Sequence, residues 1–166
     1  HVVIAMALLS NPQLLLLDEP TTALDVTVEA GVVELIKDIA KRFGTSIICI
    51  SHNLCLILET CDRICVMSSG QSVDLGSVKQ VFDQMRHPYT RGLIGSIPVL
   101  GRPQLELSVI PGNVPNLIDL PKGCRFAPRC ASRFAEPEPG AFESHPELLA
   151  ATPGHDVRCW LYHDAA

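Results

Sequence analysis

The stretch that decides the fold is LLLLDEP at residues 14–20, which TTALD at residues 21–25 follows at once. Four consecutive leucines predict a strand that is buried on both faces of a parallel sheet. Asp18 and Glu19 then lie at the carboxyl edge of the sheet, where open α/β sheets bind ligands. Adjacent like charges at a buried strand end cost free energy unless a cation or a reaction uses them. The alternative is that they only cap the next helix.

A second motif, IICISHN at residues 47–53, is another apolar run that ends at titratable groups. One helix is predicted between the two runs, so the segment is interpreted as a β-α-β unit of the α/β class. Because both strands of such a unit end at the same sheet edge, we expect Asp18, Glu19 and His52 to lie on that edge. An isolated histidine is usually structural, but here it follows the strand next to the one that carries the two acids.

The helix between the motifs is predicted from Val26 to Phe43, with Asp25 as its N-cap and Gly44 as its end. Its apolar residues recur with helical spacing and are expected to pack on the sheet. They are Val28, Val32, Leu35, Ile36, Ile39 and Phe43.

Further elements are predicted after the second motif. A short helix covers residues 54–60, two strands cover residues 62–67 and 71–75, and a helix covers residues 77–85 with Ser77 as its cap. Four cysteines lie in this part of the chain and are expected to serve packing. They are Cys49, Cys55, Cys61 and Cys65.

Composition divides the chain of 166 residues into two parts. Eleven of the 13 prolines lie at or beyond Pro88, so we expect one domain at residues 1–86 and a loop-rich extension at residues 87–166. The net charge of −5, with no cluster of lysine or arginine, does not favour nucleic acid as a partner.

The chain has no apolar run of the roughly 18 residues that a membrane span requires, and no signal peptide is recognised at its start. Seven cysteines, an odd number, favour a reducing compartment over a disulfide framework. These observations predict a soluble, cytoplasmic protein.

Together, LLLLDEP, TTALD and ISH at residues 50–52 resemble the Walker B motif, D-loop and H-loop of ATP-binding-cassette (ABC) ATPases. The resemblance implies an α/β sheet of the P-loop ABC type, with ATP and Mg²⁺ as cofactors. It further implies that Asp18 positions Mg²⁺, that Glu19 polarises the attacking water and that His52 contacts the γ-phosphate. Asp25 would reach across a dimer interface.

Three other motifs of that family are not found in this sequence: the phosphate loop, the Gln loop and the signature loop. The residues 1–9 are interpreted as a helix that is already under way. We therefore expect the chain to be the C-terminal part of a longer ATPase and to be inactive alone.

The tail carries a second resemblance. HPYTRGLI at residues 87–94, GNVPNL at residues 112–117 and LPKGCRFAPRC at residues 120–130 resemble the C-terminal extension of oligopeptide and dipeptide importer ATPases. This implies a second ATPase subunit, two transmembrane permease subunits and, indirectly, a peptide-binding protein as partners, at the cytoplasmic face of the membrane. Related importers of nickel and other solutes carry the same extension, so they remain an alternative.

Cysteines in a proline-rich segment are poor core residues, and Cys124, Cys130 and Cys159 are candidates to bind an iron–sulfur cluster or zinc. Members of the family commonly carry a fourth cysteine, about seven residues after the second, which this chain lacks. Four residues could substitute for it: Glu136, His145, His155 and His163. An empty site with reduced thiols is the alternative.

Two function classes other than an ATPase subunit remain open. One is a non-catalytic regulatory module that keeps the sheet edge and the tail. The other is a metal-binding domain in which the tail cysteines carry the function and the ATPase part is a remnant.

Overall fold

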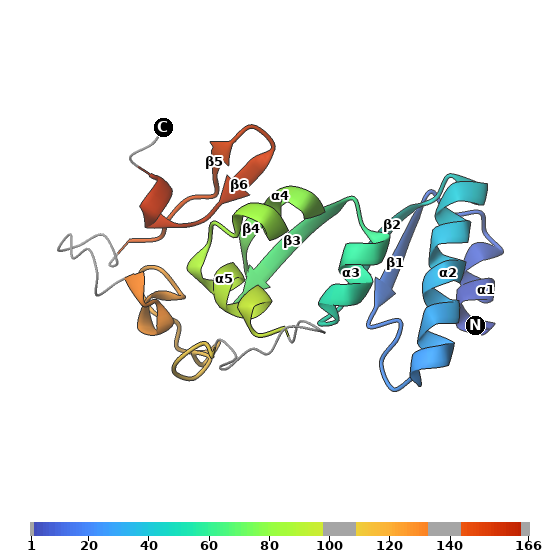
Figure 1. Ribbon diagram of the computed structural model, residues 1–166, viewed down its shortest axis with the longest axis horizontal. Coiled ribbons are helices and arrows are strands. Elements are labelled where there is room, and N and C mark those ends of the chain that lie inside the picture. The colour runs from blue at the N-terminus through green and yellow to red at the C-terminus, as the bar shows by residue number, and fades with distance from the viewer. Residues whose placement is uncertain (1, 98–108, 133–143, 164–166) are drawn as a thin grey trace. The chain divides into compact units, whose positions relative to one another are not determined.

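The structure is a computed structural model that describes residues 2–97, 109–132 and 144–163. The chain forms two compact units, residues 1–61 and residues 62–166, here called the N-terminal and C-terminal units. Both mix helices with strands, so the α/β class is confirmed (Figure 1). The predicted division at residues 86/87 falls inside the C-terminal unit and stays a prediction.

The N-terminal unit is a β-α-β unit with one helix before it and one after it. In chain order its elements are α1 (Val2–Leu8), β1 (Leu14–Asp18), α2 (Val26–Phe43), β2 (Ser46–Ile50) and α3 (Leu54–Thr60). Strands β1 and β2 pair in parallel, with Leu14 opposite Ser46 and Asp18 opposite Ile50. Because the register runs to the last residue of both strands, the loops that follow them leave from the same edge.

One face of this two-stranded sheet holds the core of the unit. Leu15 and Leu17 of β1 pack with Val32 and Ile36 of α2, and the cluster is extended by Ile4, Leu8, Ile47 and Cys49. The alternate residues Leu14, Leu16, Ile48 and Ile50 are at least half exposed. The prediction that β1 is buried on both faces is therefore wrong, since α1 and α2 both supply the same face and successive side chains of a strand point to opposite faces.

Local capping sets the ends of α2. The Asp25 carboxylate accepts hydrogen bonds from the backbone N–H groups of Thr27 and Val28, and Gly44 ends the helix in the left-handed region at φ 62°. Both ends are as predicted. The predicted apolar stripe is correct in its middle but not at its two ends, because Val28 and Phe43 are exposed. Val33, which was not in the stripe, is buried.

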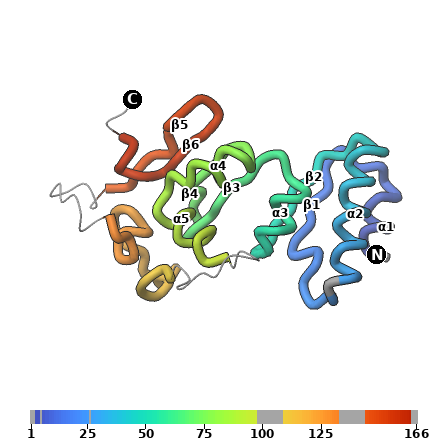
Figure 2. The backbone as a smooth tube through the Cα atoms, in the orientation of Figure 1, coloured from blue at the N-terminus to red at the C-terminus, as the bar shows by residue number. Residues whose placement is uncertain are grey.

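The C-terminal unit contains a four-stranded antiparallel sheet of order β3-β4-β6-β5 (Figures 1 and 2). Its elements are β3 (Arg63–Ser68), β4 (Gln71–Ser77), α4 (Val78–Gln84), α5 (Pro88–Gly95), the 3₁₀ turns η1 (Ala127–Arg129) and η2 (Trp160–Tyr162), and the strands β5 (Leu149–Thr152) and β6 (His155–Val157). The sequence reading missed β5 and β6, because strands of four and three residues are too short to show an alternating pattern.

A buried acid ties the tail to the sheet. Asp74 on β4 is fully buried, and its Oδ1 lies 2.5 Å from Nε2 of His155 on β6. Its Oδ2 accepts a hydrogen bond from the backbone N–H of His87 at 3.1 Å. His87 in turn caps α5, since its Nδ1 accepts a hydrogen bond from the N–H of Tyr89. One carboxylate thus links β4, β6 and the start of α5.

Cys55 and Cys65 are exposed, so the expectation that they serve packing is wrong for these two. Cys55 lies on the exposed side of α3, opposite the buried Leu56 and Ile57. Cys65 lies on the exposed face of β3, between the buried Ile64 and Val66. Within the described residues, no helix combines the length and the apolar character needed to cross a membrane.

Candidate active site

The candidate site lies at the carboxyl edge of the β1–β2 pair. Asp18 is the last residue of β1 and Glu19 follows it, while His52 lies two residues beyond the end of β2. The backbone N–H of Glu19 donates a hydrogen bond to the carbonyl of Ile50 at 2.8 Å, which continues the pairing one step past the strand. The parallel register therefore brings together two segments that are 33 positions apart.

Glu19 and His52 form a direct pair. Glu19 Oε1 lies 2.9 Å from Nδ1 of His52 and also accepts a hydrogen bond from the His52 backbone N–H at 3.2 Å. The His52 side chain is 81% exposed and that of Glu19 is 35% exposed. When Nδ1 carries the proton toward Glu19, Nε2 remains open to solvent and to a ligand.

The turn after β1 holds the second oxygen of Glu19. Thr22 donates its hydroxyl proton to Oε2 at 2.9 Å, and its backbone N–H donates to the Glu19 carbonyl at 3.2 Å. Glu19 itself adopts φ 47°, in the left-handed region that residues other than glycine enter at a cost. Both carboxylate oxygens are therefore held in place by neighbours on either side of the sheet edge.

These contacts lower the pKa of Glu19 below its ordinary value. The hydrogen bond from the His52 side chain is the largest cause, and the one from Thr22 comes next. Hydrogen bonds to the ionised form stabilise it, so Glu19 is a carboxylate at neutral pH. These donors use three of the roughly four acceptor sites of the carboxylate, so one site on Oε2 stays open to a water molecule.

Asp18 differs from its neighbour because its side chain is exposed. Exposed carboxylate oxygens at a strand end are the hard ligands that Mg²⁺ prefers, usually together with waters and phosphate oxygens. This residue therefore fits the ion that the family resemblance implies. Its role as a magnesium ligand stays a prediction.

Asp25 has an observed structural role. Its Oδ1 accepts hydrogen bonds from the N–H groups of Thr27 at 3.1 Å and Val28 at 2.9 Å. This confirms the predicted N-cap. The contact across a dimer interface that the resemblance implies stays a prediction.

The sequence reading missed two residues that support the site. The Thr22 hydroxyl donates to the Glu19 carboxylate. A hydroxyl residue three positions after an acid in a turn could have predicted this contact. Asn53 caps α3 through Oδ1 and donates from Nδ2 to Glu29 Oε1 on α2 at 2.5 Å. Asn53 thereby fixes the loop that carries His52.

The tail cysteines lie near one another in the C-terminal unit, but they do not form a ligand set. Cys130 and Cys159 are buried and Cys124 is half-buried. Burial raises the pKa of the Cys159 thiol to about 11 and also raises the pKa of Cys124. In the part of the chain that the structure describes, no three His, Cys, Asp or Glu side chains are arranged to hold a metal ion.

The residues expected to replace the fourth cysteine do not complete the set either. His155 is fully buried against Asp74, so the structure removes it as a candidate ligand. His145 is exposed, and the His163 ring lies 4.4 Å from the Trp160 ring. Glu136 lies outside the described residues.

Comparisons with known proteins support the two resemblances. Residues 73–136 match the family described as "Oligopeptide/dipeptide transporter, C-terminal region". The chain is 47% identical to the oligopeptide transport ATP-binding protein AppD of Bacillus subtilis, over 99% of this chain and 49% of the relative. It is 44% identical to the oligopeptide transport ATP-binding protein OppD of Haemophilus influenzae, over 97% of this chain and 48% of the relative.

A dipeptide transport protein shows the same extent of match. The chain is 41% identical to the dipeptide transport ATP-binding protein DppD of Bacillus subtilis, over 100% of this chain and 48% of the relative. The chain spans about half the length of the curated relatives it matches. The resemblance to ATP-binding subunits of ABC oligopeptide and dipeptide importers is thereby confirmed.

Proposed function

We propose that this chain, a homologue of the ATP-binding proteins of oligopeptide and dipeptide transport, supplies the carboxylate half of an ATP-hydrolysing site that energises peptide uptake. The observation that carries the proposal is the Glu19–His52 pair, 2.9 Å apart at a sheet edge beside the exposed Asp18. An ionised carboxylate next to an exposed imidazole suits the activation of water beside a phosphate.

Each residue has a distinct role in the proposed reaction. Asp18 would hold Mg²⁺, which would offset the negative charge of the γ-phosphate of bound ATP. Glu19 orients the attacking water and takes its proton on a carboxylate oxygen. His52 donates a hydrogen bond to a γ-phosphate oxygen through its ring.

The observed geometry adds a condition to this scheme. Glu19 Oε1 has two donors, both from His52, and Oε2 has the Thr22 hydroxyl. When the imidazole turns toward phosphate, Oε1 loses its side-chain partner and becomes free to accept a proton. We infer that nucleotide binding and activation of the base are coupled through this exchange of partners.

The proposed assembly follows from the relatives. A second ATPase subunit would pair with this one, with Asp25 at the contact, and two transmembrane permease subunits would hold the pair at the cytoplasmic face of the membrane. A peptide-binding protein would deliver the cargo. The relatives are named for oligopeptide and dipeptide transport, which favours peptides over nickel as the transported solute.

A metal centre in the tail is a second candidate, with Cys124, Cys130 and Cys159 as thiolates. The described residues do not fit it, because no three of their His, Cys, Asp or Glu side chains are arranged as a ligand group. We derive no reaction step from it. Anaerobic purification followed by metal analysis should show substoichiometric iron, and a full cluster per chain would contradict this.

The test of the main proposal restores the rest of the site by fusing a phosphate-loop segment from a relative. Glu19→Gln keeps the shape of the side chain but removes the charge that draws a proton from water. It should leave ATP binding intact and lower turnover roughly 10²–10⁴-fold. Glu34→Gln, a change at an exposed residue of α2, is the matched control and should leave turnover unchanged.

Two further variants separate the remaining roles. Asp18→Asn should weaken Mg²⁺ binding, so its defect should lessen as Mg²⁺ is raised. His52→Ala should lower turnover without that dependence. If Glu19→Gln kept near wild-type turnover while His52→Ala abolished it, the assignment of the base would be wrong.

A further inference from the structure

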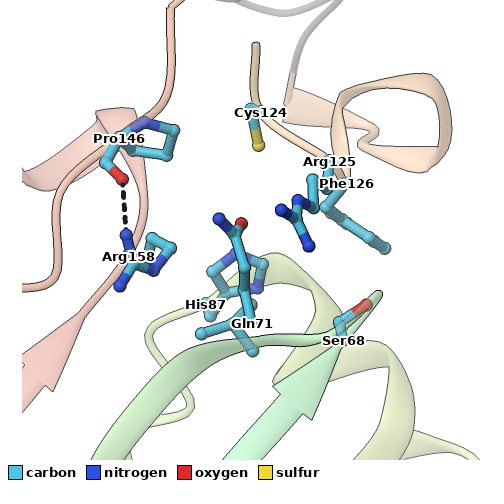
Figure 3. Close-up of a pocket in the computed structure, with 9 residues that line it drawn as sticks. Ser68, Gln71, His87, Cys124, Arg125, Phe126, Pro146 and Arg158 are labelled. Carbon is cyan, nitrogen blue, oxygen red and sulfur yellow. Dashed lines mark hydrogen bonds between the residues drawn. The ribbon is translucent and has the colours of Figure 1, made fainter. Parts of the chain in front are cut away.

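The C-terminal unit contains a pocket that the proposed reaction does not use. Its lining includes Ser68, Gln71, His87, Cys124, Arg125 and Arg158 (Figure 3). These residues come from β3, β4, the start of α5, the segment before η1 and the end of β6. The hollow measures about 250 Å³ only when open solvent is counted, so the space that the side chains enclose is much smaller. Only a small group can enter it.

Two arginines give the pocket its charge. Arg125 donates from Nη1 to the Ser69 carbonyl at 2.6 Å. Arg158 donates from Nε to the Ser72 carbonyl at 2.9 Å and from Nη1 to the Pro146 carbonyl at 3.0 Å. Carbonyl oxygens orient these guanidinium groups but do not neutralise them.

Neither arginine has a carboxylate partner in the described ranges, where ion pairs involve other residues. The other titratable groups of the lining carry no compensating negative charge. Burial lowers the pKa of His87 to about 4 and raises the pKa of the Cys124 thiol, so both are neutral at pH 7. The pocket therefore holds two cations and no anion.

One donor is left without a partner. Nε of Arg125 is buried and makes no hydrogen bond. Figure 3 shows the Arg125 guanidinium and the Gln71 amide directed into the pocket, with the Cys124 sulfur nearby. A partly buried cation with an unsatisfied donor is costly, and an oxyanion offsets both costs because its oxygens accept the paired N–H groups of a guanidinium.

We propose that this pocket binds a small oxyanion group, a carboxylate or a phosphate, between Arg125 and Arg158. All of its lining residues belong to the C-terminal unit, and none of them is a residue of the candidate active site. The inference does not depend on the proposed ATPase function.

The test uses the full chain and follows the alkylation of Cys124 by iodoacetamide, resolved by peptide mass spectrometry. Cys55 and Cys65, which are exposed, serve as internal reference thiols. Sodium phosphate, sodium acetate and sodium chloride are compared at equal ionic strength. Phosphate or acetate should slow alkylation of Cys124 severalfold and leave the two reference thiols unchanged.

Arginine variants locate the effect. Arg125→Gln should raise the anion concentration that gives half of the protection about tenfold, the loss expected for one charge-assisted pair of hydrogen bonds. Arg63→Gln removes the same charge from an exposed site on β3 and should keep the protection. Because Arg125→Gln could disturb the fold, Arg125→Lys is tested as well, and it should retain weaker protection with unchanged Trp160 fluorescence.

The comparison of the three salts also distinguishes which oxyanion the pocket binds. Protection by acetate alone indicates a carboxylate, and protection by phosphate alone indicates a phosphate group. Equal protection by chloride, no protection by any of the three salts, or unchanged protection in Arg125→Gln would overturn the proposal.

Discussion

The described residues include two carboxylate–imidazole pairs in opposite surroundings. Glu19 and His52, at the sheet edge of the N-terminal unit, lie 2.9 Å apart with the imidazole 81% exposed. Asp74 and His155, inside the C-terminal unit, lie 2.5 Å apart with both side chains fully buried. The chemical groups are the same, and only the access of solvent and ligand differs.

This difference separates a reactive pair from a structural one. An exposed pair can exchange partners because water and ligands compete for both groups, and such pairs add little to stability. A buried pair cannot exchange, since each group would lose its partner without gaining water. Glu19 is thus available for chemistry, whereas Asp74 holds β4, β6 and α5 together.

The largest expected effect comes from breaking the buried pair. Asp74→Ala leaves His155 and the N–H of His87 without their acceptor, so we expect a loss of about 3–5 kcal/mol in the free energy of unfolding of the C-terminal unit. Urea denaturation followed by the fluorescence of Trp160, the only tryptophan of the chain, measures it. Asp74→Asn, which keeps an acceptor oxygen, should lose less.

Glu19→Ala is the matched change in the exposed pair. It should not shift the midpoint of urea unfolding, measured by circular dichroism, from that of the unchanged chain. A comparable loss in both variants would show that burial does not separate the two pairs.

The next largest effect is on the pH dependence of the stability of the C-terminal unit. The pKa of His87 is lowered from 6.5 to about 4, mainly by burial, so in this range the unfolded chain binds the proton that the folded chain excludes. The stability from this group is fully present above pH 6.5 and is lost as the pH falls toward 4, on the order of 3 kcal/mol in total. Urea midpoints at a series of pH values measure the loss.

His87→Asn keeps a side-chain acceptor for the start of α5 but does not titrate. The variant should therefore show a smaller loss of stability between pH 6.5 and 4. An unchanged loss of stability in His87→Asn would contradict the assignment of this pH dependence to His87.

A smaller effect concerns the helix cap beside the exposed pair. Asp25→Ala removes the acceptor of two N–H groups and should cost about 1 kcal/mol, whereas Asp25→Ser should restore most of it. In the restored ATPase the two variants also test the proposed dimer contact. If Asp25→Ser restores ATP turnover as well as stability, Asp25 acts only as a helix cap and not in the dimer contact.

The smallest expected effect is on the pKa of Glu19. Thr22→Val removes one hydrogen bond to the carboxylate and should raise this pKa, and His52→Gln should raise it further because the imidazole is the larger cause of the lowering. Carbon-13 NMR titration of the Glu19 carboxyl resolves the order. A larger change in Thr22→Val than in His52→Gln would reverse the assignment of causes.

Sequence reasoning located the elements around the candidate site because their signals are local. Asp25 and Gly44 determine the ends of α2 through hydrogen bonds and backbone angles within a few residues. Ser77 likewise starts α4, where it forms a capping box with Gln80. Rules of this range can be read from neighbouring residues alone.

The contacts that sequence reasoning missed span the whole unit. Asp74 and His155 are 81 positions apart, and Arg125 reaches the Ser69 carbonyl over 56 positions. No spacing rule connects such residues. His155 was therefore considered as a metal ligand, whereas in the structure it is the partner of the buried Asp74. The two short tail strands depend in the same way on β4, which supplies the hydrogen bonds that three or four residues cannot supply alone.

By itself, the sequence determined the α/β class, the resemblance to peptide-importer ATPases and the order of acid, acid and imidazole along the chain, because each depends on residues close in sequence. Only the tertiary structure decided which leucines of β1 are buried, which oxygen of Glu19 faces His52 and which of the two histidine–carboxylate pairs is closed to solvent. The physical reason is that burial and partner choice are set by the packing of distant segments, and the free energy of a charged pair depends on that packing more than on the identity of its residues.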